Sequence, residues 1–557
     1  MTGPALAANT QPMNQPPGTR ILSPSPSQVI GLLNEAQQRL RRGDYPGAAD
    51  LAQIVLRAEP RKAEAWVMLC ASLMRMGSLD DDNALADALA ALPPSDPAHT
   101  LLAVERCRVL ANRGRYNEAV ALADQTLQRT QLAPRQHDLL ANTFTSCGLY
   151  ERALHHAEIA VAAMPRDPAT TYNHALALRH IGRIDEAVES FESLLGLFPD
   201  HALGYFSLSA CRRWDKGSNH IAAIQTALKG GVLEDVDRAR LNYALFKEAH
   251  DLGDHTTAWS ALKAGADIVQ RTSPFPLEER TAYTQSIMRR FSSGLDAKPV
   301  DSDGPIPIFI VGLPRSGTTL VERIFSAHPD VTDMGETHGL ALAIRDALGL
   351  ARYGELDPAS VEKMQEANWP EVARLYIESL AYRAPKTRFF TEKLPHNYHL
   401  VGAIRRAFPE ARIVHLRRAP MDSLFGAYKV LFGEGSYIWS YRFEDLAAAY
   451  SLYRQLTDHW RNVLGGNLVE ITLEKLIADS DSEIRRPRGG IGLPFHEACL
   501  SPHKASGGVS TASTTQVRQP INSQGVGAWR AYSDQLEPLR AMLEQAGFVD
   551  AAGDPVW

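Results

Sequence analysis

Several features that would mark common classes of protein are missing from this sequence. No apolar run approaches the roughly 18 residues that a membrane-spanning helix needs. The 557 residues carry a net charge of -6, so the excess of positive charge typical of a general nucleic-acid binder is absent. Residues 1–27 are rich in Pro, Ser, Gln and Asn and lack the basic-then-apolar pattern of a secretory signal. We therefore predict a cytoplasmic protein with a disordered tail at 1–27, no membrane association and no nucleic-acid partner.

Cysteine is scarce as well. The five cysteines are scattered, odd in number and without the spacing of a metal-binding cluster. This pattern predicts buried or partly buried free thiols in a reducing compartment, and no metal site. The residues are Cys70, Cys107, Cys147, Cys211 and Cys499.

The first half of the chain carries an internal repeat. Five glycines recur at intervals of 34, 37, 34 and 34 residues, namely Gly43, Gly77, Gly114, Gly148 and Gly182. An alanine follows most of them at five residues, and a proline follows three of them at seventeen. Glycine allows a tight turn, alanine lets two helices approach, and proline ends a helix. This is the tetratricopeptide pattern, so residues 28–300 are predicted to form a helical solenoid.

A solenoid of this kind presents a concave face that usually holds an extended peptide or a partner protein. We therefore expect a peptide or protein partner in the groove of the repeat array. Two alternatives stay open: the array packs only against a second domain, or it mediates homodimerisation.

The pattern changes after a short polar linker at 301–305. Apolar runs rich in β-formers alternate with helical patterns, which predicts a parallel sheet wrapped by helices over residues 301–557. The expected fold is thus α plus α/β, with strands at 306–311, 330–333, 388–391, 411–416 and 468–471. In such sheets ligands bind at the carboxyl ends of the strands.

The first of these strands runs into a phosphate-binding type of loop. Residues 312–319 have the spacing G-x-x-x-x-G-T-T, in which Thr318 replaces the usual lysine and Arg315 supplies a cation earlier in the loop. Backbone N–H groups and the start of the next helix would form an anion cradle. Because a nucleoside-triphosphate enzyme uses the missing lysine with magnesium, the loop suits a different anion.

Four other motifs follow predicted strands or lie in polar loops. Glu336 and His338 are candidate bases, with His338 the alternative, and Lys393 could neutralise charge on a transferring group. Arg417 and Arg418 with Ser423 suit a second phosphate. The polar loop 513–522 could close over a nucleotide.

The combination resembles the sulfotransferases that use 3′-phosphoadenosine-5′-phosphosulfate (PAPS), above all the tyrosylprotein sulfotransferases and bacterial tetratricopeptide-repeat sulfotransferases. The resemblance implies PAPS as sulfuryl donor without a metal, Glu336 as the base, and Arg315 and Lys393 as transition-state stabilisers. Residues 314–319 are similar to the 5′-phosphosulfate loop, Arg418 to the residue that grips the 3′-phosphate, and 513–522 to the segment that covers the nucleotide. The donor-binding residues so implied are Pro314, Arg315, Ser316, Gly317, Thr318, Thr319, Arg418, Ser423, Ser513, Thr514, Gln516, Val517, Pro520 and Asn522.

The chain departs from the family pattern on the 3′-phosphate side. Gly426 stands where the family has a serine, which Ser423 would replace, and Ala419, Leu473 and Ala528 also differ from the usual residues. The leading hypothesis is sulfuryl transfer from PAPS to a hydroxyl acceptor such as a protein tyrosine held by the repeats, with a glycan or small metabolite as other acceptors. The alternatives are a scaffold or binding protein with a degenerate sulfotransferase domain, and a P-loop kinase, which the missing lysine disfavours.

Overall fold

The chain divides into two compact units in the computed structural model, Met1–Leu102 and Ala103–Trp557. The structure describes residues 25–76, 80–231, 233–295, 304–350, 356–433, 435–485, 491–505 and 519–557. Most of the tail predicted at 1–27 lies outside these ranges, and the first described helix begins at Pro26. Within the described ranges, no helix has both the length and the apolar character needed to cross a bilayer.

The first unit consists of helices that pack against their neighbours in sequence. The turn between the first two helices contains Gly43 at φ +79°, and Asp44 then caps the second helix by accepting a hydrogen bond from the Gly47 N–H. Val29, Val55 and Leu69 lie in the shared apolar core. The helices are α1 (Pro26–Arg41), α2 (Tyr45–Ala58), α3 (Ala63–Arg75), α4 (Asp80–Ala91) and the start of α5 (Pro97–Asn112).

The second unit begins with further pairs of helices joined by short turns. These helix pairs confirm the predicted repeats. The glycines at 114, 148, 182 and 253 all have φ between 70° and 98°, the left-handed region that glycine enters at little cost. The predicted turn glycine Gly77 lies outside the described residues. The helices are α6 (Tyr116–Arg129), α7 (Pro134–Ser146), α8 (Tyr150–Ala163), α9 (Pro168–Ile181), α10 (Ile184–Leu197), α11 (Ala202–Ser209), α12 (Ile221–Lys229), α13 (Asp235–Asp251), α14 (His255–Thr272) and α15 (Leu277–Arg290).

A five-stranded parallel sheet follows the repeats, as predicted. Its order is β2-β3-β1-β4-β5, and all four strand pairs are parallel. The carboxyl ends of β1 and its two neighbours therefore lie at one edge, where the candidate motifs begin. The strands are β1 (Ile306–Gly312), β2 (Val331–Asp333), β3 (Phe389–Lys393), β4 (Arg412–Arg417) and β5 (Leu468–Thr472).

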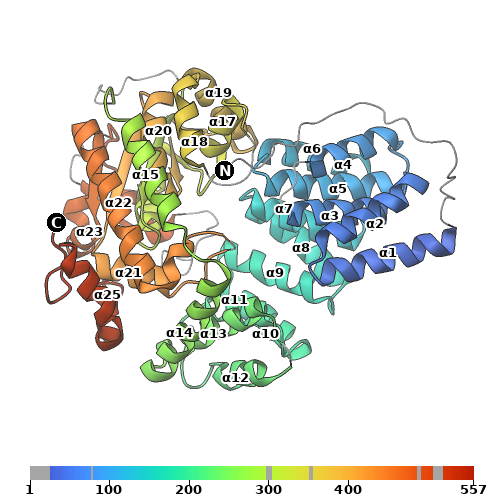
Figure 1. Ribbon diagram of the computed structural model, residues 1–557, viewed down its shortest axis with the longest axis horizontal. Helices are drawn as coiled ribbons and strands as arrows, with labels where there is room; N and C mark the ends of the chain where they lie inside the picture. The colour runs from blue at the N-terminus through green and yellow to red at the C-terminus, as the bar shows by residue number, and fades with distance from the viewer. Residues whose placement is uncertain are drawn as a thin grey trace. The chain divides into compact units, whose positions relative to one another are not determined.

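Helices cover this sheet (Figure 1). The helix α16 leaves the loop after β1 and contacts β1, β2 and β3, while α21 leaves the loop after β4. The helices of this domain are α16 (Thr318–Ser326), α17 (Gly339–Ala347), α18 (Pro358–Lys363), α19 (Trp369–Ser379), α20 (Val401–Ala407), α21 (Pro420–Tyr428), α22 (Phe443–Leu464), α23 (Leu473–Ala478), α24 (Ser480–Arg485) and α25 (Ser533–Gln545).

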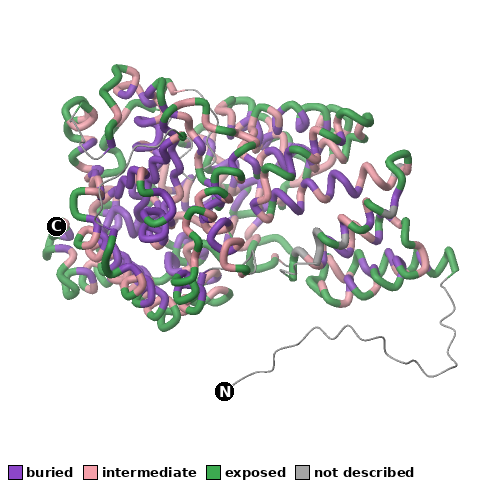
Figure 2. The backbone as a smooth tube through the Cα atoms, turned by 90° about the horizontal axis from the view of Figure 1, so that it is seen from above, coloured by how far each residue is buried: buried purple, intermediate pink, exposed green. Residues whose placement is uncertain are grey.

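Strand β1 separates two apolar cores. Its residues are buried along the whole strand, and alternate side chains enter opposite faces because successive residues of a strand point to opposite sides. Ile308 and Ile310 join the core under α16. Phe309 and Val311 join a larger core that continues without a break into helices α9 to α14 of the repeats. Figure 2 shows buried residues both along the repeat helices and within the sheet domain.

Polar and aromatic contacts also tie the repeats of the second unit to the sheet domain. The Tyr243 hydroxyl on α13 donates to the Tyr428 carbonyl oxygen at 3.2 Å, and His250 Nδ1 lies 2.8 Å from the Tyr532 hydroxyl. Earlier in the array, the rings of Tyr116 and Tyr382 lie 5.7 Å apart. The repeats of the second unit thus pack against the sheet domain, and this contact leaves the partner-binding role of the array open.

The five cysteines are all buried, as predicted. Burial raises the pKa of Cys107 and of Cys147 to about 12. Thiols of this kind are mostly protonated near neutral pH and react slowly.

The contact between Gly402 and Phe291 gives a testable prediction for this packing. A Cβ on Gly402 in α20 would lie 2.3 Å from the buried ring of Phe291, which follows α15. We expect Gly402→Ala to lower the free energy of unfolding by about 1–3 kcal/mol, the usual cost of overpacking. The matched control is Gly196→Ala in α10, where a Cβ meets nothing within 4 Å; it should stabilise by about 0.5–1 kcal/mol. Denaturant unfolding of the two variants measures both, and equal effects would contradict the prediction.

Candidate active site

The loop between β1 and α16 is built around unusual backbone angles. Gly317 has φ +99° and Arg315 has φ +65°, a conformation that costs about 1–2 kcal/mol for a residue with a Cβ. Strained backbone of this type gathers at functional sites. The Ser316 hydroxyl closes the loop by donating to the Leu313 carbonyl oxygen at 2.7 Å, and Thr318 begins the helix, so backbone N–H groups converge as an anion-binding nest.

Arg418 connects this loop to the far end of the chain. Its Nη1 donates to the Arg315 carbonyl oxygen at 2.6 Å, and its Nη2 donates to the Gly525 carbonyl oxygen. Its buried Nε has no hydrogen-bond partner within the described residues. Burial, and then the charge of Arg418, lower the pKa of Arg315 to about 10. Two partly buried guanidinium groups at one place form a site that favours an anion.

Glu336 and Lys393 form a direct ion pair beside the same loop. Lys393 is the last residue of β3 and is 1% exposed, whereas the Glu336 side chain is 37% exposed. Burial lowers the pKa of Lys393, but the charges of Glu336 and Glu322 outweigh it and raise that pKa above its ordinary value. The raised pKa favours the charged form of Lys393, and the Glu336 side chain stays partly open to solvent. His338 is also exposed.

A second acidic side chain, that of Glu322, lies close to this ion pair. Glu322 on α16 is 5% exposed, and its Oε2 lies 3.9 Å from Lys393 Nζ. Burial, and next the charge of Asp333 on β2, raise the pKa of Glu322 well above its ordinary value. The raised pKa favours the protonated form of Glu322, so Glu336 is the main negative partner of Lys393.

A third acid was not predicted from the sequence. Glu392 precedes Lys393 and is completely buried on the opposite face of β3. It accepts hydrogen bonds from the Tyr376 hydroxyl and from Asn397 Nδ2 at 2.8 Å. Burial raises the pKa of Glu392 to about 7, although these hydrogen bonds lower it. The sequence points to the next residue, Lys393, as a functional cation, but it does not point to Glu392. A single glutamate in a strand resembles an ordinary surface charge.

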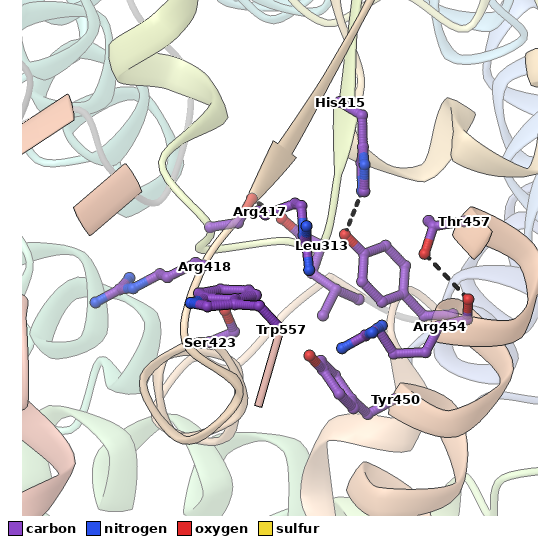
Figure 3. A pocket seen from close by; sticks show the side chains of 11 residues that line it. Leu313, His415, Arg417, Arg418, Ser423, Tyr450, Arg454, Thr457 and Trp557 are labelled. Carbon is purple, nitrogen blue, oxygen red and sulfur yellow. Dashed lines mark hydrogen bonds between the residues drawn. The ribbon is translucent and has the colours of Figure 1, made fainter. Parts of the chain in front are cut away.

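The structure places Ser423 and Gly426 against different neighbours. Ser423 borders a cavity of about 10 Å³ with Leu313, Arg417, Tyr450, Arg454 and Trp557. That volume holds about one water molecule. Arg418 lines the same cavity as Ser423, and its side chain extends to one side of it (Figure 3). A Cβ on Gly426, by contrast, would lie 3.1 Å from the Arg315 Cβ.

The segment predicted to cover the nucleotide is described only in part. Ser513, Thr514, Gln516 and Val517 lie outside the described residues, while Pro520 and Asn522 are exposed. Beyond them the chain is anchored to α21, since the Gly527 N–H donates to Asp422 Oδ2 at 2.7 Å.

The other departures from the family pattern also have neighbours. The Ala419 N–H donates to Glu474 Oε1 at 2.8 Å. Leu473 packs under the loop, where a Cβ on Gly317 would lie 2.8 Å from its Cδ1. Among the described side chains, no group of three or more His, Cys, Asp or Glu residues is arranged to hold a metal ion.

Comparison with known proteins identifies this domain. Residues 307–497 match the model of the Sulfotransferase family. The chain combines tetratricopeptide repeats with a sulfotransferase-family domain. It is 24% identical over 376 residues to a protein of Aquifex aeolicus, which covers 66% of this chain and 49% of that protein. It is 23% identical over 284 residues to protein-tyrosine sulfotransferase 1 of Danio rerio, covering 46% of this chain and 75% of that one.

Two solved structures were also similar at low scores. The sulfotransferase domain from the Synechococcus PCC 7002 olefin synthase has a TM-score of 0.30 and 22% identity, covering 42% of this chain and 90% of that one. The tetratricopeptide-repeat protein YrrB has a TM-score of 0.21 and 14% identity, covering 42% of this chain and 92% of that one. This chain spans about half the length of the Aquifex aeolicus relative.

The buried Glu392 of the sulfotransferase domain predicts a pH-dependent stability. Its folded pKa of about 7 lies above the ordinary value of 4.5, so its stabilising contribution is complete below pH 4.5 and is lost as pH rises through 7. Glu392→Gln cannot ionise. We compare the free energy of unfolding of this variant with that of the unchanged protein at each pH. From pH 5 to pH 8 the difference should move in favour of the variant by up to about 3 kcal/mol, because one pKa unit corresponds to about 1.4 kcal/mol.

Urea unfolding at the two pH values measures this gain. Glu444→Gln is the control, because Glu444 is an exposed acid paired only with exposed Arg442. A Glu392→Gln protein whose stability relative to the unchanged protein is the same at both pH values would contradict the prediction.

Proposed function

We propose that the protein transfers a sulfuryl group from PAPS to a hydroxyl, and that the natural acceptor is a protein tyrosine. The observation that supports this best is the ion pair of Glu336 and Lys393 beside the anion-binding loop. A base and a buried cation at one edge of the sheet are the two groups that proton removal and leaving-group stabilisation require.

The residues present fit a doubly anionic nucleotide such as PAPS. The loop with Arg315 and the start of α16 would hold the 5′-phosphosulfate, and Arg418, whose buried Nε lacks a partner within the described residues, would hold the 3′-phosphate. Bound there, PAPS would supply the sulfuryl group. Pro314, Ser316, Thr318 and Thr319 would line the loop, and the 513–522 segment with Pro520 and Asn522 would cover the nucleotide.

The chemical work of the protein is then divided between two side chains. Glu336 takes the proton from the acceptor hydroxyl, whose oxygen forms the new bond to sulfur. Lys393 donates a hydrogen bond to the bridging oxygen, which keeps the electron pair of the broken S–O bond. Arg315 and the loop N–H groups stabilise the same negative charge. When Glu336 is protonated it no longer balances the charge of Lys393.

The contacts of the repeats support a protein as acceptor. Arg383 Nη2 donates to the Asp333 carbonyl oxygen at 2.8 Å, three residues before Glu336. The same arginine packs on the repeat turn at Gly148, where a Cβ would lie 2.7 Å from its Nη1. A peptide on the repeats would therefore be held next to the segment that carries the base. The relatives named protein-tyrosine sulfotransferases favour tyrosine as the accepting residue.

The first test of this function is substitution of the base. Glu336→Gln should lower the turnover of sulfuryl transfer by about 10²–10⁴-fold, the usual contribution of a general base, and should leave the affinity for 3′-phosphoadenosine-5′-phosphate unchanged. Calorimetry measures binding, and transfer of labelled sulfate from PAPS to tyrosine peptides measures turnover. Glu366→Gln, outside the site, should retain both, and full turnover in Glu336→Gln would refute the assignment.

The acceptor is tested by a separate experiment. The purified protein is incubated with labelled PAPS and a lysate, and the labelled species are identified. Label on protein tyrosine is the expected result; label on a glycan or metabolite would replace the acceptor proposed. An absence of both nucleotide binding and label would leave a scaffold protein with a degenerate sulfotransferase domain.

A further inference from the structure

The outer edge of the sheet is covered by the chain that precedes β3. Strand β2 ends the sheet order and pairs with β3 on one side only among the described residues, so its outer backbone groups need other partners. Thr332 Oγ1 lies 2.7 Å from Thr387 Oγ1 and accepts from the Lys386 N–H at 3.2 Å. Arg383 Nη2 donates to the Asp333 carbonyl oxygen at 2.8 Å. The last two residues of β2 are thus held from outside by residues 383–387.

The backbone runs from this edge directly to Glu336. The Gly335 N–H donates to Asp333 Oδ1 at 2.9 Å, and the Gly335 carbonyl oxygen accepts from the Lys393 N–H at 2.9 Å. Asp333 therefore fixes the turn that leads into Glu336, and the same turn is bonded to the lysine that pairs with Glu336. A shift of Asp333 would carry Glu336 with it.

Both ends of the segment that carries Glu336 rest on turns of the repeats. On the side before it, Arg383 lies against Gly148 in the turn between α7 and α8, where a Cβ would lie 2.7 Å from Nη1. On the side after it, α17 begins three residues beyond Glu336, and its Leu342 lies against Gly114 in the turn between α5 and α6. A Cβ there would lie 2.3 Å from Leu342 Cδ1. The turn glycines of two consecutive repeats thus make room for one side chain each.

The repeats also fix the short 3₁₀ helix η2 (Ala381–Arg383), which carries this arginine. The ring of Tyr382 lies 5.7 Å from the ring of Tyr116 on α6. Arg383 itself lies at the carboxyl end of α7, where a helix carries partial negative charge and favours a cation. Arg383 therefore contacts a repeat through Nη1 and the edge of β2 through Nη2 at the same time.

We propose that Arg383 and Leu342 are positioning residues, through which the repeat turns at Gly148 and Gly114 hold Glu336 in place for proton removal. This inference rests on the proposed function, because it takes Glu336 as the base. The repeats then contribute to turnover and not only to acceptor binding. Rates of this kind are sensitive to geometry, since a displacement of about 1 Å can lower them about 10²-fold.

A pair of glycine substitutions tests the proposal from the side of the repeats. Gly148→Ala places a methyl group where Arg383 Nη1 lies and should lower kcat about 10- to 100-fold, with the KM for PAPS and the affinity for 3′-phosphoadenosine-5′-phosphate unchanged. Gly253→Ala is the matched control. Gly253 has φ +79° against +70° for Gly148, so the backbone strain is similar, but its Cβ would meet nothing within 4 Å. It should retain kcat, and an equal loss in both variants would overturn the proposal.

Substitution of the arginine tests whether it acts through the base. Arg383→Met should lower kcat as Gly148→Ala does, and Arg383→Lys, which keeps a donor, should recover part of the loss. In the Glu336→Gln protein, Arg383→Met should change single-turnover transfer of labelled sulfate by less than about twofold, because residues that act as a unit are not additive. A loss as large as in the unchanged protein would show that Arg383 does not act through Glu336. Leu342→Ala should behave as Arg383→Met does.

Hydrogen exchange gives a readout that does not depend on the donor. Arg383→Met should make the amides of residues 333–337 exchange several times faster than in the unchanged protein, while those of β4 stay the same, because the effect is a local opening. Unaltered exchange in 333–337 would overturn the positioning role whether or not the protein is active.

The outcomes separate the two hypotheses. If the unchanged protein transfers sulfate and Arg383→Met keeps full turnover, the role of Arg383 is wrong and the proposed function stands. If the unchanged protein neither binds 3′-phosphoadenosine-5′-phosphate nor transfers sulfate, the proposed function fails, and the exchange of residues 333–337 still decides whether Arg383 holds this segment.

Discussion

A buried lysine must keep negative charge beside it, and the sulfotransferase domain is organised around that requirement. Lys393 ends β3 with almost no exposure, next to the exposed carboxylate of Glu336 and the buried carboxyl group of Glu322. These three groups come from a strand, a loop and a helix, so the pair forms only when β1, β2 and β3 are aligned and α16 is in place. The ion pair therefore depends on the whole sheet edge, and a mispositioned strand would leave a charge without compensation.

Much of the fold follows from patterns that the sequence shows directly. The spacing of Gly43, Gly114, Gly148 and Gly182 predicts the repeats because each turn needs a left-handed residue. The strand β1 is apolar throughout because both of its faces are covered, which is a property of parallel sheets. The predicted strand ends differ from those observed by one or two residues, since the hydrogen bonds that define an end are made with a neighbour in space.

The site was less accessible to sequence reasoning. Loop spacing locates Arg315, and motifs that follow strands locate Glu336 and Lys393, but nothing in the sequence says that the last two pair. Glu322 and Glu392 were missed for one reason: each resembles a surface charge in the sequence, and only the packing of neighbouring elements buries it. The closing segment 513–518 lies outside the described residues, so its residues stay predictions.

The apolar core that β1 shares with helices α9 to α14 affects how the chain can be divided into fragments. Cutting the chain at the linker near residue 301 would expose Tyr243, Leu262 and the faces that cover them to water. An excised sheet domain would then expose a contiguous apolar surface and aggregate. The repeats of the second unit share the core of the sulfotransferase-family domain, so a fragment of this domain would have to carry them along.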